Sequence, residues 1–70
     1  MKLSARNVFP GKIVSVKKGP ISSLVVIEIA PGVQLTSTIT AEAVSELKLK
    51  KGSPAYAIIK APNVILGVDD

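Results

Sequence analysis

The chain contains no cysteine and no histidine, and these two absences exclude several kinds of site. Without cysteine the chain forms no disulfide and no thiolate zinc site. Without histidine it lacks the commonest transition-metal ligand and the usual base of a catalytic nucleophile. We therefore expect no metal site built from protein side chains.

Carboxylates are also few, because only five of the 70 residues are acidic. Glu42 and Glu46 have the spacing of an ordinary exposed helix face, and Asp69 and Asp70 form a short acidic stretch. Neither pair resembles the paired carboxylates of a catalytic site, and nothing in the sequence positions a Ser–Lys pair. The sequence therefore predicts a protein that is not an enzyme.

Long apolar runs are missing too, although 47% of the residues are hydrophobic. No run reaches the length of a membrane span, and the start of the chain does not resemble a signal peptide. We therefore expect a cytoplasmic protein with no membrane partner.

Residues 1–70 make a single domain, and a domain this small usually needs disulfides, a metal or association with other copies for stability. Since the first two are excluded, the apolar content favours self-association.

Aromatic residues make up only 3% of the chain, whereas the net charge is +4. The charge favours anionic partners such as nucleic acid, membrane headgroups or small oxyanions. Barrels that bind single strands stack bases on exposed aromatic side chains, and this chain offers only Phe9 and Tyr56. Binding of nucleic acid therefore has little support, but it stays open as the alternative function.

Proline and glycine turn signals, Pro10-Gly11 among them, divide the chain into short segments rich in β-branched residues. The predicted strands are residues 2–8, 12–17, 22–29, 33–39, 55–60 and 64–68. Thr40 is expected to cap a short helix that Gly52 ends, with Val44 and Leu47 on its apolar face. This order of elements predicts a mostly β fold, a small barrel of five or six strands of the oligonucleotide/oligosaccharide-binding (OB) type with one short helix.

Two basic residues lie at positions of the chain where ligand contacts are common. Arg6 lies in the donor-rich stretch Ser4-Ala5-Arg6-Asn7, and Lys60 ends an apolar strand just before a turn. Clusters of this kind hold oxyanions. The same two residues are equally compatible with an ordinary surface charge and with a lysine that extends from a sheet edge to solvent, so the residues alone leave both interpretations open.

Several segments along the chain, taken together, resemble the molbindins, the small molybdate-binding proteins also called Mop proteins, whose fold unit is a TOBE-like domain. The matching segments are Ser4-Ala5-Arg6-Asn7, residues 11–14, 16–19, 25–29 and 36–40, and Lys60-Ala61. The resemblance implies an OB-type barrel that assembles as a homohexamer, a trimer of dimers. It also implies binding of molybdate, and of tungstate, at subunit interfaces for intracellular molybdenum storage and homeostasis.

The resemblance further implies which residues bind the oxyanion. The matching positions are Ser4, the backbone of Ala5, Arg6, Thr40, Lys60 and Ala61. Thr40 corresponds to the first of two hydroxyl positions at the start of the family's helix. The second position, usually serine, is Ala43 here, so one hydroxyl donor of the family's site is absent.

Overall fold

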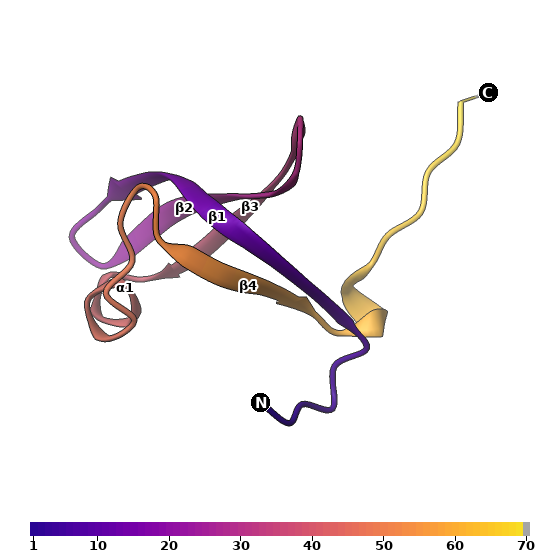
Figure 1. Cartoon of the computed structure of the whole chain (residues 1–70), viewed down its shortest axis with the longest axis horizontal. Coiled ribbons are helices and arrows are strands. Elements are labelled where there is room, and N and C mark those ends of the chain that lie inside the picture. Colours follow the sequence, from indigo (N-terminus) through magenta and orange to yellow (C-terminus); the bar gives the residue numbers. More distant parts are fainter. Residues whose placement is uncertain (70) are drawn as a thin grey trace.

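The computed structural model describes residues 1–69, so the predicted acidic stretch lies within it only up to Asp69. The elements are β1 (Asn7–Lys18), β2 (Ser22–Ala30), β3 (Val33–Thr40), α1 (Ala41–Glu46), β4 (Pro54–Ile59) and a 3-10 turn (Ala61–Asn63). The four strands form one curved antiparallel sheet in the order β3-β2-β1-β4, with α1 at one end (Figure 1). The predicted mostly β, OB-like fold with one short helix is confirmed.

β1 is a single long strand, and the turn predicted at Pro10-Gly11 is wrong. Pro10 pairs with Tyr56 of β4, and the strand continues without a break. A Cβ atom on Gly11 would lie 2.5 Å from the carbonyl oxygen of Glu28 on β2. This glycine therefore permits a close approach of β2 to a curved strand.

The strand count is four, fewer than the five or six predicted. The first predicted strand begins only at Asn7, and residues 64–68 form no strand at all. Residues 2–6 have no partner because the pairing of β1 with β4 ends at Asn7 and Ile59, and residues 64–68 follow a 3-10 turn that contains Pro62 and leads away from the sheet (Figure 1). β3 and β4 are therefore left as the two edges of the sheet, and within one chain the barrel is not closed.

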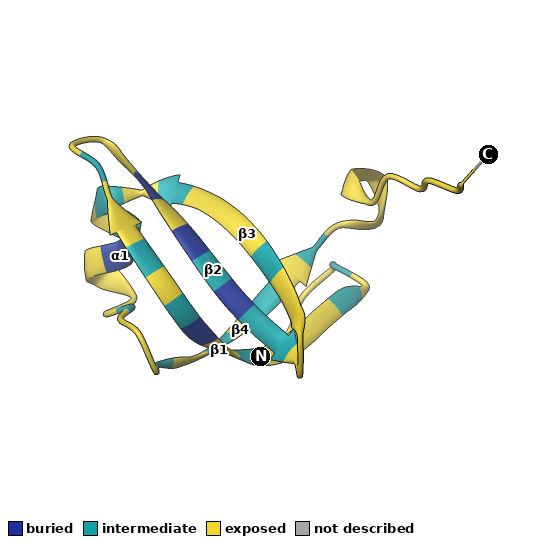
Figure 2. Cartoon of the chain, turned by 90° about the horizontal axis from the view of Figure 1, so that it is seen from above, coloured by how far each residue is buried: buried dark blue, intermediate teal, exposed yellow. Residues whose placement is uncertain are grey.

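The hydrophobic core is small for the apolar content of the sequence. Within the described residues, the buried hydrophobic side chains are Ile13, Val25, Ile27 and Val44. Leu35 and Ile39 of β3 and Ala57 of β4 pack against this cluster but remain half-buried. Figure 2 shows the buried positions concentrated along β1, β2 and α1, with β3 and β4 more exposed. The single chain thus leaves much apolar surface in contact with solvent.

Helix α1 begins as the sequence predicts. Thr40 is its N-cap residue, and the Oγ1 atom of Thr40 accepts a hydrogen bond of 3.0 Å from the Ala43 N–H. Val44 is buried as expected, but Leu47 is 65% exposed, so the predicted apolar face is only partly used. Within residues 1–69, no helix combines the length and apolarity that crossing a membrane requires.

The helix ends at Glu46, well before the predicted stop at Gly52. Lys48 adopts a left-handed conformation with φ 53°. The Lys48 N–H donates to the Ser45 carbonyl at 3.1 Å, and the Leu49 N–H donates to the Val44 carbonyl at 3.0 Å. This pair of bonds is a Schellman cap, in which glycine normally takes the left-handed position.

Candidate oxyanion-binding site

The N-terminal stretch and the end of β4 meet at one corner of the molecule. Asn7 pairs with Ile59, and the Asn7 Nδ2 atom donates to the Ile59 carbonyl oxygen at 3.1 Å. Arg6 and Lys60 are the next residues on the two strands, so their backbones leave the sheet side by side. Ser4 and Ala5 precede Arg6, and Ala61 follows Lys60. We call this region the β1–β4 corner and define it as Ser4, Ala5, Arg6, Lys60 and Ala61. The structure therefore brings the Arg6 and Lys60 stretches, which contain five of the six predicted site residues, to the same corner of the sheet.

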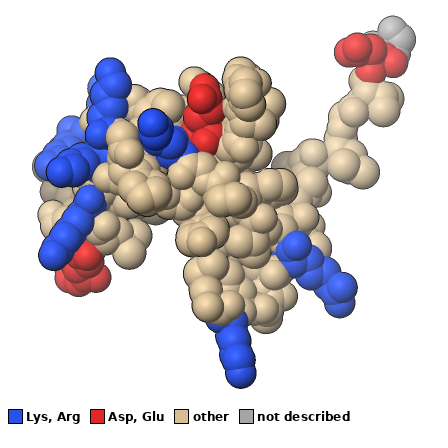
Figure 3. Space-filling model, in the orientation of Figure 1, with Lys and Arg blue, Asp and Glu red and all other residues tan. Residues whose placement is uncertain are grey.

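The β1–β4 corner is open to solvent and positively charged. Arg6 and Lys60 are both exposed. Figure 3 shows the basic side chains in two groups, a larger one toward α1 and a smaller one near the start of β1, with no acidic side chain beside the smaller group on the face drawn. Guanidinium and ammonium groups offer donors and no acceptor, so this corner attracts anions that only accept hydrogen bonds.

Thr40, the sixth predicted residue, lies at the opposite end of the sheet. It pairs with Ser22 at the start of β2, close to where Lys18 ends β1. β1 is 12 residues long, and at about 3.3 Å per residue a strand of that length spans up to about 36 Å. Figure 1 shows α1 at one end of β1 and the start of β1 at the other. One copy of the chain therefore does not place Thr40 beside Arg6.

Two backbone N–H groups at the start of α1 already donate hydrogen bonds within the chain. The Ala43 N–H is used by the Thr40 side chain, and the Ala41 N–H donates to the Ile21 carbonyl at 2.8 Å. Because Oγ1 of Thr40 acts as an acceptor in its cap, its hydroxyl hydrogen is still available to a ligand. Thr40 is thus a better candidate donor than the backbone of the helix behind it.

A hollow elsewhere on the surface is lined by lysines from β1 and from the loop after α1. Lys50 and Lys51 line it with Lys18 of β1, and its volume is about 400 Å³. The loop after α1 is held against β1 by two backbone bonds, from Gly52 N–H to the Ile13 carbonyl at 2.7 Å and from Ile13 N–H to the Ser53 carbonyl at 2.8 Å. No local pattern in the sequence encodes this long-range contact.

The structure gives no support to stacking of nucleic-acid bases. Phe9 pairs with Ala57, whereas Tyr56 pairs with Pro10. Side chains of consecutive strand residues point to opposite faces of a sheet, so the two aromatic side chains lie on different faces. Among residues 1–69, no group of three or more metal-ligating side chains gathers in one place.

Comparison with known proteins finds a family model and relatives that match almost the whole chain. Residues 3–66 match the family model of the TOBE domain. A protein of Haemophilus influenzae described as "Probable molybdenum-pterin-binding protein" is 49% identical over 69 residues, covering 99% of this chain and 100% of the relative.

Two solved structures are also similar. MopII from Clostridium pasteurianum is 40% identical with a TM-score of 0.89, and the match covers 96% of this chain and 100% of MopII. The cytoplasmic molybdate-binding protein ModG, solved with molybdate bound, is 45% identical with a TM-score of 0.93. That match covers 99% of this chain but 49% of ModG. The likeness therefore extends over essentially the whole chain and includes a ligand-bound structure.

Proposed function

The chain belongs to the TOBE domain family and, within it, to the Mop-type molbindins, and from this we propose that it binds molybdate at sites shared between two copies. The β1–β4 corner of one copy supplies Arg6, Lys60, the Ser4 hydroxyl and the backbone N–H groups of Ala5 and Ala61. A second copy supplies the Thr40 hydroxyl.

Molybdate suits this set of groups because it is a dianion whose four oxygens accept hydrogen bonds and donate none. Charge-assisted hydrogen bonds from Arg6 and Lys60 provide most of the attraction, and the hydroxyl and backbone donors set the orientation. The protein contacts only the oxygens of the anion and supplies no ligand to molybdenum itself. Tungstate has the same shape and charge, so we propose that it binds at the same site.

The observation that supports a site shared between two copies is the separation between Thr40 and the β1–β4 corner. Arg6 and Lys60 are neighbours through the Asn7–Ile59 pair, whereas Thr40 lies at the far end of β1. Only a second copy can bring Thr40 to the same anion. We accordingly propose a homohexamer, a trimer of dimers, that stores molybdate in the cytoplasm without catalysing a reaction.

Mixing two inactive variants tests the shared site. Arg6→Ala removes the main cation of the corner, and Thr40→Asp places a negative charge in the other half of the site. In a randomly mixed assembly, about one quarter of the sites should combine an intact corner with an intact Thr40. Calorimetric titration of the co-expressed pair should therefore show molybdate binding that neither variant shows alone.

A mixture of Arg6→Ala with Lys60→Ala is the matched control. Both changes lie in the same corner, so every site receives a defective corner and the mixture should bind molybdate no more tightly than Lys60→Ala alone. If the first mixture binds no more molybdate than its components, the shared site is wrong. If the control mixture recovers as well, Arg6 and Lys60 do not act on the same anion.

A further inference from the structure

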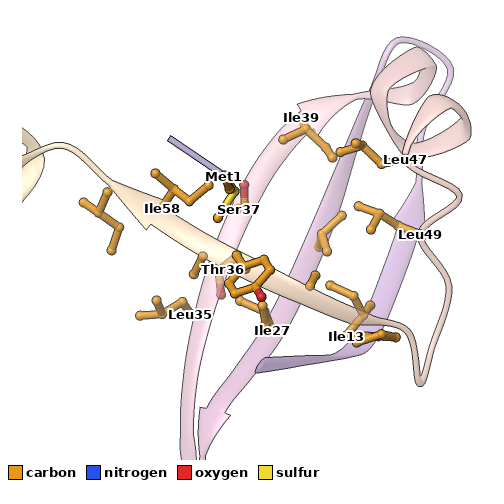
Figure 4. A pocket seen from close by; sticks show the side chains of 16 residues that line it. Met1, Ile13, Ile27, Leu35, Thr36, Ser37, Ile39, Leu47, Leu49 and Ile58 are labelled. Atoms are coloured by element: carbon orange, nitrogen blue, oxygen red, sulfur yellow. The ribbon is translucent and has the colours of Figure 1, made fainter. Parts of the chain in front are cut away.

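Two hollows in the described surface differ in chemical character. The one between β3 and β4 is lined mainly by apolar side chains and has a volume of about 650 Å³ (Figure 4). The other, of about 400 Å³, lies beside the second half of β1, and we call it the basic hollow. It is lined by Val14, Val16 and Lys18 of β1 and by Leu49, Lys50 and Lys51 of the loop after α1. The basic hollow shares no residue with the proposed molybdate site.

One wall of the basic hollow is a stretch of β1 whose outer edge has no strand partner. The pairing of β1 with β4 stops at Lys12, and the backbone bonds from the loop after α1 to β1 go to Ile13. In the described chain, residues 14–18 of β1 therefore pair with β2 alone. A free strand edge of this kind offers backbone donors and acceptors to a further strand.

The turn after β1 indicates which backbone groups face the basic hollow. The Gly19 N–H donates to the Ser22 carbonyl at 2.9 Å, across the hairpin of β1 and β2. In an antiparallel pair, the backbone groups of successive residues point alternately toward the partner strand and away from it. The N–H and carbonyl groups of Val16 and Lys18 therefore point away from β2, on the side where the basic hollow lies.

The side chains around this edge combine positive charge with an apolar floor. Lys18, Lys50 and Lys51 are all exposed, and they lie at the end of the molecule where Figure 3 shows the larger group of basic side chains. Val16 and Leu49 are half-buried and pack against the core. An occupant of the basic hollow therefore needs backbone-like donors and acceptors, negative charge and some aliphatic surface.

We propose that the basic hollow binds an extended acidic segment of a partner protein, which adds to the edge of β1 as a short strand. The backbone of the segment pairs with Val16 and Lys18, and its carboxylates face the three lysines. A fully ionised oxyanion fits less well, because it has no donor for the carbonyl groups of the edge. Nucleic acid also fits less well, because no aromatic side chain lines the hollow for a base to stack on.

A short blocked peptide in which glutamate and valine alternate is the probe. It carries a fluorophore and is titrated by fluorescence anisotropy at about 0.15 M salt, where attraction between distant charges is screened. Lys50→Glu combined with Lys51→Glu should weaken binding at least about tenfold, because carboxylates would then face carboxylates. The titration contains no molybdate, so its outcome is independent of the proposed molybdate site.

Lys17→Glu combined with Lys48→Glu is the matched control. It changes the net charge by the same amount, but neither residue lines the basic hollow, so the affinity should fall by less than about threefold. Circular dichroism should show that both double variants are folded. An equal loss of affinity in the two variants would mean that overall charge alone attracts the peptide, and it would overturn the proposal.

The addition of a strand is tested through the backbone of the peptide. A peptide with the same side chains but N-methylated amides keeps its charge and loses its backbone donors, so it should bind at least about tenfold more weakly. Hydrogen exchange followed by NMR should show that the unmethylated peptide slows exchange of the Val16 and Lys18 N–H groups. Equal binding of the two peptides, unchanged exchange at both groups, or displacement of the peptide by molybdate would contradict the added strand.

Discussion

Replacing Thr40 with aspartate should separate the stability of α1 from the binding of the anion. In the folded chain Oγ1 of Thr40 accepts the Ala43 N–H at 3.0 Å, and an aspartate oxygen performs the same capping role about as well. Thr40→Asp should therefore fold as stably as the native chain. Thr40→Ala, which has no capping atom, should lose about 1 kcal/mol.

The effect on molybdate should run in the opposite order. Two unit charges about 4 Å apart repel by about 4 kcal/mol at an effective dielectric constant of about 20. Molybdate carries two negative charges, and a partly hydrated interface screens some of this repulsion. Thr40→Asp should therefore weaken binding by at least about 100-fold. Thr40→Ala loses a single neutral donor and should weaken it only about 3- to 10-fold.

Both quantities can be measured on one preparation at a fixed chain concentration. Circular dichroism gives the melting temperature, and calorimetric titration gives the affinity for molybdate. A loss of 1 kcal/mol corresponds to a shift of about 4–8 °C for a domain of this size. Thr40→Ser, which keeps both the cap and the hydroxyl hydrogen, is the control. If Thr40→Asp bound molybdate within threefold of the native chain, Thr40 would lie outside the site.

Five other changes have definite expected outcomes. Arg6→Ala should abolish measurable binding of molybdate and Lys60→Ala should weaken it at least about tenfold, because each removes charge-assisted hydrogen bonds; calorimetric titration with unchanged circular dichroism checks both. Ala43→Ser should tighten molybdate binding by about 0.5–1.5 kcal/mol without changing assembly, and a lower melting temperature with unchanged affinity would instead place Ala43 in the core. Gly11→Ala should destabilise the fold by about 2 kcal/mol or more in urea denaturation, because its Cβ would lie 2.5 Å from a carbonyl oxygen of the neighbouring strand. Lys48→Gly should stabilise the fold by about 1 kcal/mol, because glycine adopts the left-handed conformation without strain; a lower urea midpoint would refute this.

Features that depend on a few consecutive residues could be predicted from the sequence. The Thr40 cap is of this kind, because its hydroxyl bonds to a group only three residues away. The β2–β3 hairpin is another, since Pro31-Gly32 forms its turn with Gly32 at φ 75°. In both places the local chemistry selects one backbone conformation whatever the rest of the chain does.

Features that depend on distant contacts could not be predicted in the same way. Pro10-Gly11 resembles a turn, yet the close approach of Glu28 on β2 makes this glycine part of a strand. Residues 64–68 have a strand-like composition, but a strand also needs a partner, and in the described chain these residues pair with no strand. For the candidate site, the Arg6 and Lys60 stretches were identified from sequence. Their approach through the Asn7–Ile59 pair, and the distance to Thr40, required the fold.

The cap at the start of α1 also restricts the direction of the Thr40 hydroxyl hydrogen. Because the Ala43 N–H occupies one side of Oγ1 of Thr40, the hydroxyl hydrogen must point elsewhere, toward whatever lies outside the helix. The side chains of Arg6 and Lys60 have no acceptor atom. An anion surrounded by these three side chains finds hydrogens on every side. Phosphate near neutral pH still carries a proton and would bring it against another hydrogen, whereas fully ionised molybdate would not. The proposed site would thus distinguish anions by the number of protons that they retain, in addition to their size.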